Sequence, residues 1–453
     1  MCIYLVTLDD ERAKAALCST SPLQEVRATM TITDSERPAE AHDASDARHT
    51  TLLPAVGASF FPIALVARFP YAMMVVGVLT LVVAGRGSLG IGGLTSAMVG
   101  VGTAIFGPLI GSAADRFGQR LVVMLAGLAS SLALLTMSWV VYSPLPDAAV
   151  LAAAFVIGAT TPQVPPMSRS RLVGIIARRI VPERRTAVTT STMAYESAVD
   201  ELTFVFGPMI VGLLAATMSP AAPVIGAAVL TLIFVTAFAL HSSVHEVPSN
   251  RSAGVVAAPA RELLRPGLVV VLVGVLGIGL FFGSLLTALT SAMSDAGHAE
   301  SAGLVYGVMG IGSAAFALGS ALFPAGFTLH ARWIVFPLIM VVGTAALLVV
   351  EAMPLLLVVL LVLGIGLGPT LVVVYSIASD RSPRGRGATV MTMATTGIVV
   401  GQSAASAING HIAETAGTQA ALLAPLAAAS LITVAGLVNR AMVARASSAG
   451  AEG

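Results

Sequence analysis

Long apolar runs recur along the chain, separated by short polar segments that hold most of the charged residues. A helix that crosses the hydrocarbon core of a bilayer needs roughly 20 mostly apolar residues. The run from Thr161 to Pro166 disrupts the end of the fourth such segment, and Phe60 to Ala67 form a lead-in before the first. By this rule the sequence predicts twelve spanning helices, at 69–85, 90–112, 121–143, 148–167, 188–217, 223–241, 267–293, 302–323, 333–350, 354–377, 388–412 and 419–439.

Composition agrees with a membrane protein. Charged residues make up 10% of the chain and hydrophobic residues 56%, whereas soluble domains are about 25% charged. The two cysteines, Cys2 and Cys18, suggest neither a disulfide framework nor a metal site. The sequence contains no GxxxxGK[ST] motif and no paired histidine metal motif. We therefore expect no cofactor, no metal and no nucleic acid partner.

The arginines predict the orientation of the helices. Basic residues are concentrated on the cytoplasmic side of membrane proteins. When the twelve segments are numbered in order, 18 arginines fall on the side shared by the two tails, and only Arg86 falls on the other. We therefore predict a multi-pass protein of the plasma membrane with both termini in the cytoplasm.

The chain divides into two similar parts. Residues 182–187 and 383–388 share a Pro-x-x-Arg-x-Ala pattern at an offset of 201, each leading into the fifth segment of its part. This match favours two parallel repeats of six helices. The predicted parts are a disordered cytoplasmic tail at 1–55, an N-terminal bundle at 56–243, a cytoplasmic linker at 244–265, a C-terminal bundle at 266–441 and a second tail at 442–453.

The segment after the second predicted helix contains the most specific motif. It runs from Gly111 to Arg120 and resembles the GxxxDRxGxR signature that the major facilitator superfamily carries in this position. All five defining positions match: Gly111, Asp115, Arg116, Gly118 and Arg120. The resemblance implies an all-α membrane protein of two pseudo-symmetric six-helix bundles that acts as a transporter and not as an enzyme. The chain looks most like actinobacterial permeases of that superfamily, many of unknown substrate.

The chemistry of this motif suits a gate. Gly111 lets two helices approach closely, and Gly118 permits a turn with positive φ. Asp115 can accept hydrogen bonds from the N-terminus of a helix in the other half, where the helix dipole is positive. Arg116 and Arg120 can pair with carboxylates or anionic lipid. A static cap that also sets the topology is the alternative interpretation.

The fifth predicted helix carries three carboxylates, Glu196, Asp200 and Glu201. Asp200 lies about twelve residues from the helix start, or roughly 18 Å at 1.5 Å per residue, which is near mid-membrane. Ionised groups at this depth are costly and commonly functional, so these acids are candidates for proton coupling or for lining a substrate cavity. The alternative is structural. In that interpretation Glu196 pairs with an arginine of the segment between the fourth and fifth predicted helices, and Asp200 or Glu201 closes a fixed salt bridge to Arg68.

Gly207 and Pro208 follow on the same helix and resemble the Gly-Pro motif of superfamily antiporters. Proline kinks a helix, and glycine allows close packing, which we expect here at the interface of the halves. The match is partial, and no arginine lies between Ala148 and Met167, where exporters carry one. We expect a monomeric carrier that exports a small organic solute in exchange for protons. Proton-linked nutrient import is the alternative, and a non-transporting sensor or an intramembrane enzyme is less favoured.

Overall fold

The computed structural model describes residues 51–297, 302–324, 326–350 and 352–451. These residues form helices and no β-strand, which confirms the predicted all-α class. Of the predicted disordered tail at 1–55, residues 1–50 lie outside the described residues, whereas its last residues are helical because α1 begins at Leu52. The helices are α1 (Leu52–Val56), α2 (Phe60–Val66), α3 (Phe69–Arg86), α4 (Leu89–Phe117), α5 (Gln119–Val140), α6 (Asp147–Thr160), α7 (Val164–Arg179), α8 (Arg185–Thr217), α9 (Ala222–Leu230), α10 (Thr236–Leu240), α11 (Pro266–Asp295), α12 (Ala302–Gly319), α13 (Leu329–Leu347), α14 (Met353–Asp380), α15 (Gly387–Ala416), α16 (Thr418–Ala421) and α17 (Leu423–Ala451).

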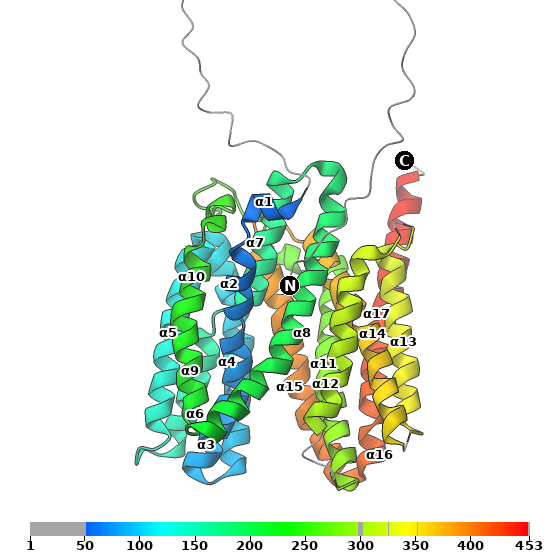
Figure 1. Ribbon diagram of the computed structural model, residues 1–453. Coiled ribbons are helices and arrows are strands. Elements are labelled where there is room, and N and C mark those ends of the chain that lie inside the picture. Colours follow the sequence, from blue (N-terminus) through cyan, green and yellow to red (C-terminus); the bar gives the residue numbers. More distant parts are fainter. Residues whose placement is uncertain (1–50, 298–301, 325, 351, 452–453) are drawn as a thin grey trace, which may run out of the picture. The chain divides into compact units, whose positions relative to one another are not determined.

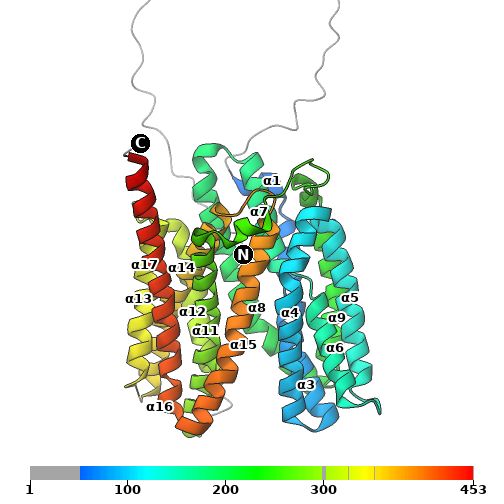
Figure 2. The same ribbon diagram turned by 180° about the vertical axis from the view of Figure 1, so that it is seen from behind.

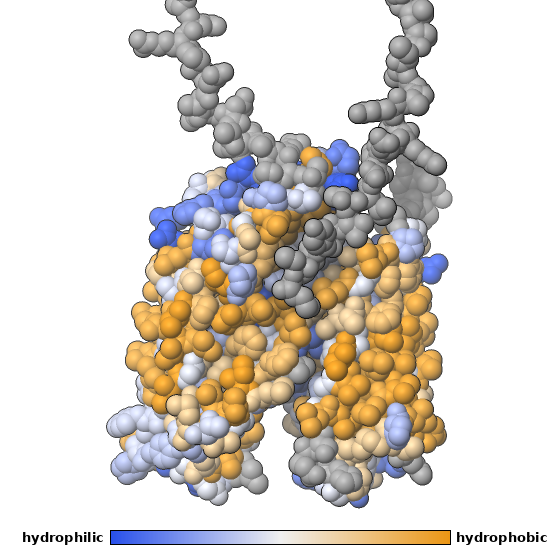
Figure 3. All heavy atoms as spheres, in the orientation of Figure 1, coloured by the Kyte–Doolittle hydropathy of each residue, from blue (hydrophilic) through white to orange (hydrophobic). Residues whose placement is uncertain are grey.

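Eleven helical segments among the described residues are long and apolar enough to cross a membrane. The predicted span at 388–412 lies in α15, which is not among the eleven because Thr, Ser, Gln and Asn residues reduce its apolar character. Along the middle of the helices the visible surface is mostly apolar, with hydrophilic side chains at both ends (Figure 3). This distribution fits a multi-pass membrane protein whose large exposed apolar side chains face lipid.

Within residues 48–453 the long helices form two groups. Helices α2–α10, here called the N-terminal half, lie beside helices α11–α17, the C-terminal half, in both views (Figures 1 and 2). Most helix pairs contact each other within a half, as α4 contacts α6 and α11 contacts α15. Between the halves, α4 and α7 contact α15, and α8 contacts α12 and α14. These helix pairs place side chains of one half against the other.

Glycines permit the closest of these helix contacts. A Cβ atom at Gly111 of α4 would lie 2.0 Å from the Thr392 side chain of α15, and one at Gly107 would lie 2.5 Å from Thr396. At the same positions any larger residue would push the helices apart. The sequence of α4 therefore allows its close approach to α15 along the last turns before Phe117.

The first and fourth predicted spans are both composite. The chain bends between α2 and α3, and Arg68 stands at the start of α3. The fourth span breaks at Thr161–Gln163, as the prolines predicted, but the chain then forms a second helix, α7, instead of a polar loop. The predicted C-terminal tail is likewise helical as far as Ala451, because α17 continues beyond the predicted span.

The segment between α10 and α11 runs along the end of the molecule at which α4 ends and α15 begins (Figure 2). It contains two short 3-10 turns, Ser242–Glu246 and Ala260–Leu264. The carboxylate of Glu246 forms hydrogen bonds with Nε and Nη2 of Arg179 at 2.8 and 3.0 Å. This segment is therefore fixed to α7 of the N-terminal half where it begins.

Candidate functional site

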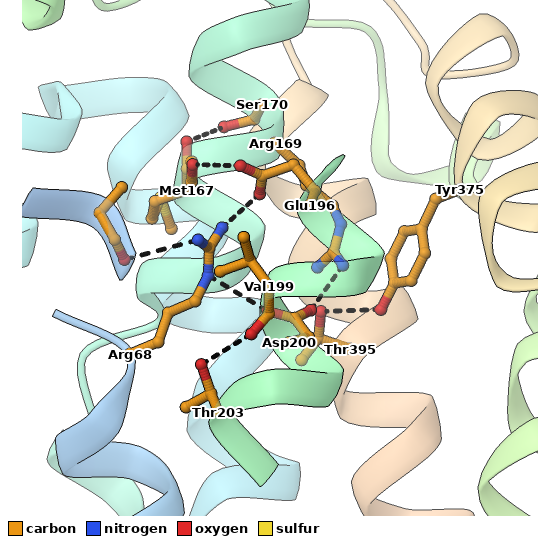
Figure 4. A network of polar contacts seen from close by, with 12 residues as sticks. Arg68, Met167, Arg169, Ser170, Glu196, Val199, Asp200, Thr203, Tyr375 and Thr395 are labelled. Atoms are coloured by element: carbon orange, nitrogen blue, oxygen red, sulfur yellow. Dashed lines mark hydrogen bonds and ion pairs between the residues drawn. The ribbon is translucent and has the colours of Figure 1, made fainter. Parts of the chain in front are cut away.

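Two arginines and two carboxylates meet inside the N-terminal half and form what we call the central ion-pair cluster: Arg68, Arg169, Glu196 and Asp200 (Figure 4). Arg68 donates to Glu196, and its Nε lies 3.1 Å from Oδ1 of Asp200. Arg169 donates through Nη2 to Oδ2 of Asp200 at 2.5 Å. The side chains of Arg68, Arg169 and Glu196 are at most 1% exposed, whereas that of Asp200 is 20% exposed.

Local sequence places each member of this cluster. Glu196 and Asp200 are four residues apart on α8, so they share one face of that helix. Arg68 reaches this face from the bend between α2 and α3, and Arg169 from the first turns of α7. Ser168, next to Arg169, donates to the second oxygen of Glu196 at 2.9 Å. Two guanidinium groups thus balance two carboxylates, an arrangement that offsets much of the cost of burying charges.

Arg169 also contacts the C-terminal half. Its guanidinium carbon lies 3.9 Å from the ring centroid of Tyr375 on α14, a cation–π contact. The Tyr375 hydroxyl lies 3.2 Å from Oγ1 of Thr395 on α15. The Nε and Nη1 atoms of Arg169 are buried without a hydrogen-bond partner among the described residues. The arginine that balances Asp200 is therefore also the cluster's contact with the other half.

Glu201 lies apart from the cluster. Its side chain is buried at 7% exposure and accepts a hydrogen bond of 3.0 Å from the hydroxyl of Ser313, on α12 of the C-terminal half. In the part of the chain that the structure describes, Glu201 forms no ion pair with an arginine or lysine. The three carboxylates of α8 therefore stand in two environments, one rich in cations and one without them.

The residues of the GxxxDRxGxR motif join the two halves at one end. The carboxylate of Asp115 accepts hydrogen bonds from the backbone amides of Ala388 and Thr389 at 2.9 and 2.8 Å, and from the Thr389 hydroxyl at 2.7 Å. These groups form the N-terminus of α15, where unpaired amides favour an anion. Gly118 has a φ of 98°, which turns the chain from α4 into α5. Arg116 and Arg120 are exposed at this end. We call this contact the Asp115 latch.

Gly207 and Pro208 lie inside α8, but the packing differs from our expectation. A Cβ atom at Gly207 would lie 2.5 Å from the Cβ of Ala72 on α3. The close approach is thus within the N-terminal half and not at the interface of the halves. The helix continues on both sides of Pro208, from Arg185 to Thr217.

Two arginines that we assigned to a polar loop are buried in α7. Arg169 belongs to the central cluster, and Arg171 donates to Gln119 at 2.9 Å and to the carbonyl of Phe238 at 2.9 Å. Arg68 is also buried, so three of the 18 arginines used to predict orientation do not mark a membrane surface. Pro165 and Pro166 were the overlooked signal, because proline is common in the first turn of a helix.

Of the two structural alternatives, the structure supports one in part. Arg68 does pair with Asp200, but it also pairs with Glu196, for which we expected an arginine from the segment between the fourth and fifth predicted helices. Glu201 does not pair with Arg68. Ser168 and Ser313 were not singled out from the sequence, because nothing in the local pattern distinguishes them from other serines in helices.

Comparisons with known proteins agree on one family. The model of the Major Facilitator Superfamily matches residues 60–406. A search of curated proteins found no significant match. The similar solved structures include the human organic anion transporter MFSD10 (TETRAN), with a TM-score of 0.67 and 17% identity, covering 85% of this chain and 99% of that one.

Two further solved structures have the same fold. One is a bacterial homologue of the iron transporter ferroportin, with a TM-score of 0.66 and 15% identity over 84% of this chain and 98% of that chain. The other is the E. coli fucose:proton symporter FucP, with a TM-score of 0.59 and 13% identity over 83% of this chain and 98% of that chain. At these identities the likeness establishes the fold alone.

Proposed function

Since this chain belongs to the major facilitator superfamily, whose members are transporters and not enzymes, we propose that it exports a small organic solute in exchange for protons by alternating access. The two halves would rock against each other around a site near the middle of α8. The observation that carries the proposal is the difference between Glu201 and the two other carboxylates of that helix.

Glu201 is the proposed proton carrier. Glu196 and Asp200 each form an ion pair with at least one guanidinium group, which balances their negative charge. Among the described residues, Glu201 is buried beside a serine hydroxyl and forms no ion pair with a cation, so a bound proton would greatly reduce the cost of its burial. Its partner Ser313 belongs to the other half. Separation of α8 from α12 would expose Glu201 to water, where it can release its proton, so proton binding and movement of the halves are linked.

The Asp115 latch is the proposed gate. It joins α4 to α15 at one end, while the space-filling view shows a notch between the halves at the opposite end (Figure 3). Most of the exposed arginines lie at the latched end, which supports a cytoplasmic location for that end. On that orientation the structure represents a carrier closed to the cytoplasm and open to the outside.

Two features support export as the direction. Gly207 and Pro208 keep the antiporter-like pair on α8, and Arg169 supplies the membrane-embedded arginine that was missing from the predicted fourth span, since that span extends from Asp147 to Arg179. Proton-linked import is the second candidate, and the structural likeness to a fucose:proton symporter is the observation that favours it. The two candidates differ in whether solute and proton move in opposite directions or together.

Proteoliposomes test the function. Solutes are first selected by their thermal stabilisation of the purified protein, because a ligand stabilises the state that it binds. Proteoliposomes loaded with a pH indicator are then given each selected solute, and a pH gradient is imposed in either direction. Export in exchange for protons predicts that protons move down their gradient while the solute moves in the opposite direction. Movement of both in the same sense would support import and refute exchange.

Glu201→Gln tests the assigned carrier, with Glu414→Gln, an exposed residue of α15, as the matched control. We expect Glu201→Gln to abolish solute-dependent proton movement and Glu414→Gln to retain it. Infrared spectroscopy gives a readout that needs no solute. A band from a protonated carboxyl group should be present at neutral pH and absent only from the Glu201→Gln protein. Coupled proton movement that persists in Glu201→Gln would contradict the assignment.

A further inference from the structure

A cavity of about 620 Å³ lies beside the Asp115 latch. Its walls come from the end of α4, from the segment between α10 and α11, and from the start of α15. The polar side chains on these walls include those of Arg116, Arg251, Arg386, Asp115, Asn250 and Thr389. Ligand sites commonly have volumes of about 300 to 1,000 Å³, so this cavity has the size of a small-molecule or headgroup site.

The charge of the cavity is positive. Arg116, Arg251 and Arg386 belong to three different segments, and none of them forms an ion pair with a carboxylate of residues 51–297, 302–324, 326–350 or 352–451. Nε of Arg386 donates to the carbonyl of Ala258 at 2.6 Å, and the Arg116 guanidinium lies 5.1 Å from the Phe117 ring centroid. The Asp115 carboxylate already accepts three hydrogen bonds from the start of α15. Three arginines thus line a cavity whose one carboxylate already accepts hydrogen bonds from α15.

Asn250 fixes the segment that closes this cavity. Its backbone amide donates to the carbonyl of Asp115 at 2.9 Å, and its side-chain amide donates to the carbonyl of Gly385 at 2.6 Å. Gly385 has a φ of 70°, and a Cβ atom there would lie 2.9 Å from the Asn250 side chain. Further along this segment, the amide of Ala258 donates to the carbonyl of Arg384 at 3.0 Å. The cavity walls are therefore held in place by contacts with both halves.

We propose that this cavity binds a phosphate-bearing anion, either a phospholipid headgroup or a soluble phosphate compound, through Arg116, Arg251 and Arg386. Arginine is well suited to phosphate because its planar group can donate two parallel hydrogen bonds. An anion there would reduce the repulsion among three like charges from the N-terminal half, the connecting segment and the C-terminal half. It would thereby stabilise the latched state and slow the transport cycle. That consequence rests on the proposed alternating access, whereas binding itself does not.

Binding is tested on the purified full-length chain in detergent, with inorganic phosphate and pyrophosphate as soluble probes and chloride at equal ionic strength as the reference. A second arm uses nanodiscs of phosphatidylcholine with or without phosphatidylglycerol. Arg251→Gln removes one arginine of the cavity that takes no part in the hydrogen bonds of the latch, and Arg261→Gln removes an exposed arginine of the same segment outside the cavity. We expect at least a tenfold loss of affinity in Arg251→Gln and no change in Arg261→Gln.

The outcomes separate the two sources of the anion. Saturable stabilisation by the soluble probes would identify a soluble phosphate site, and stabilisation by phosphatidylglycerol alone would identify a lipid headgroup site. Equal binding by the Arg251→Gln and Arg261→Gln proteins, or no stabilisation in either arm, would overturn the proposal. Loss of proton coupling in Glu201→Gln tests the transport mechanism separately, so failure of one leaves the other standing. Binding without a shift toward the latched state would retain the site and refute its effect on gating.

Discussion

Asp115→Asn is the sharpest test of the latch. The carboxylate accepts three hydrogen bonds of 2.7 to 2.9 Å from the start of α15. Asparagine keeps one acceptor oxygen, but it loses the charge and presents an amide donor to the backbone amides. Hydrogen bonds to charged groups contribute about 1.5 to 3 kcal/mol each. Water replaces part of this when the latch opens, so we expect a net loss of about 3 kcal/mol, which is roughly a 100-fold change in the equilibrium.

Spin labels measure this change directly. Glu183 and Arg384 are exposed side chains at the latched end, one in each half, and both can be replaced by cysteine after Cys2 and Cys18 are changed to serine. Double electron–electron resonance should show a second, longer distance in Asp115→Asn that is weak or absent in the parent. Asp147→Asn, at an exposed residue 3.8 Å from Arg86, is the matched control. A population ratio that shifts less than twofold in Asp115→Asn would show that these hydrogen bonds do not hold the gate.

Further predictions follow from packing, charge balance and pH. Gly207→Ala should destabilise the protein by about 1 to 3 kcal/mol, because its Cβ would lie 2.5 Å from that of Ala72. Gly212→Ala is the control. It has nothing within 4 Å of its Cβ, so it should not lower the thermal unfolding temperature. Arg169→Met should destabilise the protein by about 3 to 5 kcal/mol, since it removes one of the two cations beside Asp200. The double variant Arg169→Met with Asp200→Asn should recover much of that stability in the same thermal unfolding assay. Equal losses in the single and double variants would contradict the charge argument. The hydrogen bond from Arg179 lowers the pKa of Glu246, so the ionised form is favoured in the folded protein. The stability from this contact is present above the usual glutamate range near pH 4.3 and is lost as pH falls through the lowered pKa. Glu246→Gln should therefore cost less than about 1 kcal/mol at neutral pH, and its difference from the parent should vanish in acid thermal unfolding scans.

The sequence was sufficient to predict the features that depend on short stretches of chain. Helix positions follow from the length of the apolar runs, because lipid requires the backbone to satisfy its own hydrogen bonds. Both Asp115 and its type of partner, a helix start in the other half, were expected from a ten-residue motif. Helix α15 lies where the span at 388–412 was predicted, but its polar residues keep it out of the eleven segments that are apolar enough to cross a membrane.

Pairing between distant segments was beyond the local pattern. Arg169 is 31 residues from Asp200, and Ser313 is 112 residues from Glu201. Which side chains meet depends on how α7 and α12 rotate and slide against α8, and no periodicity in either helix fixes that register. Arg169 and Arg171 follow the predicted fourth span at 148–167, so the sequence placed them in a connecting segment. Charged residues inside a membrane protein are rare, but here the Asp200 carboxylate and the Phe238 carbonyl provide buried partners for them.

The location of these charges limits how coupling can work. All four members of the central ion-pair cluster belong to the N-terminal half, so a rigid movement of that half would carry the ion pairs along without breaking them. Contacts that cross to the other half must instead change, and these include Glu201 with Ser313, Arg169 with Tyr375, and Asp115 with the start of α15. A proton on Glu201 alters the first of them directly. It reaches the second only if Asp200 and Arg169 also rearrange. The carboxylate that lies at the moving interface is thus better placed to couple protons to transport than the better-paired carboxylates behind it.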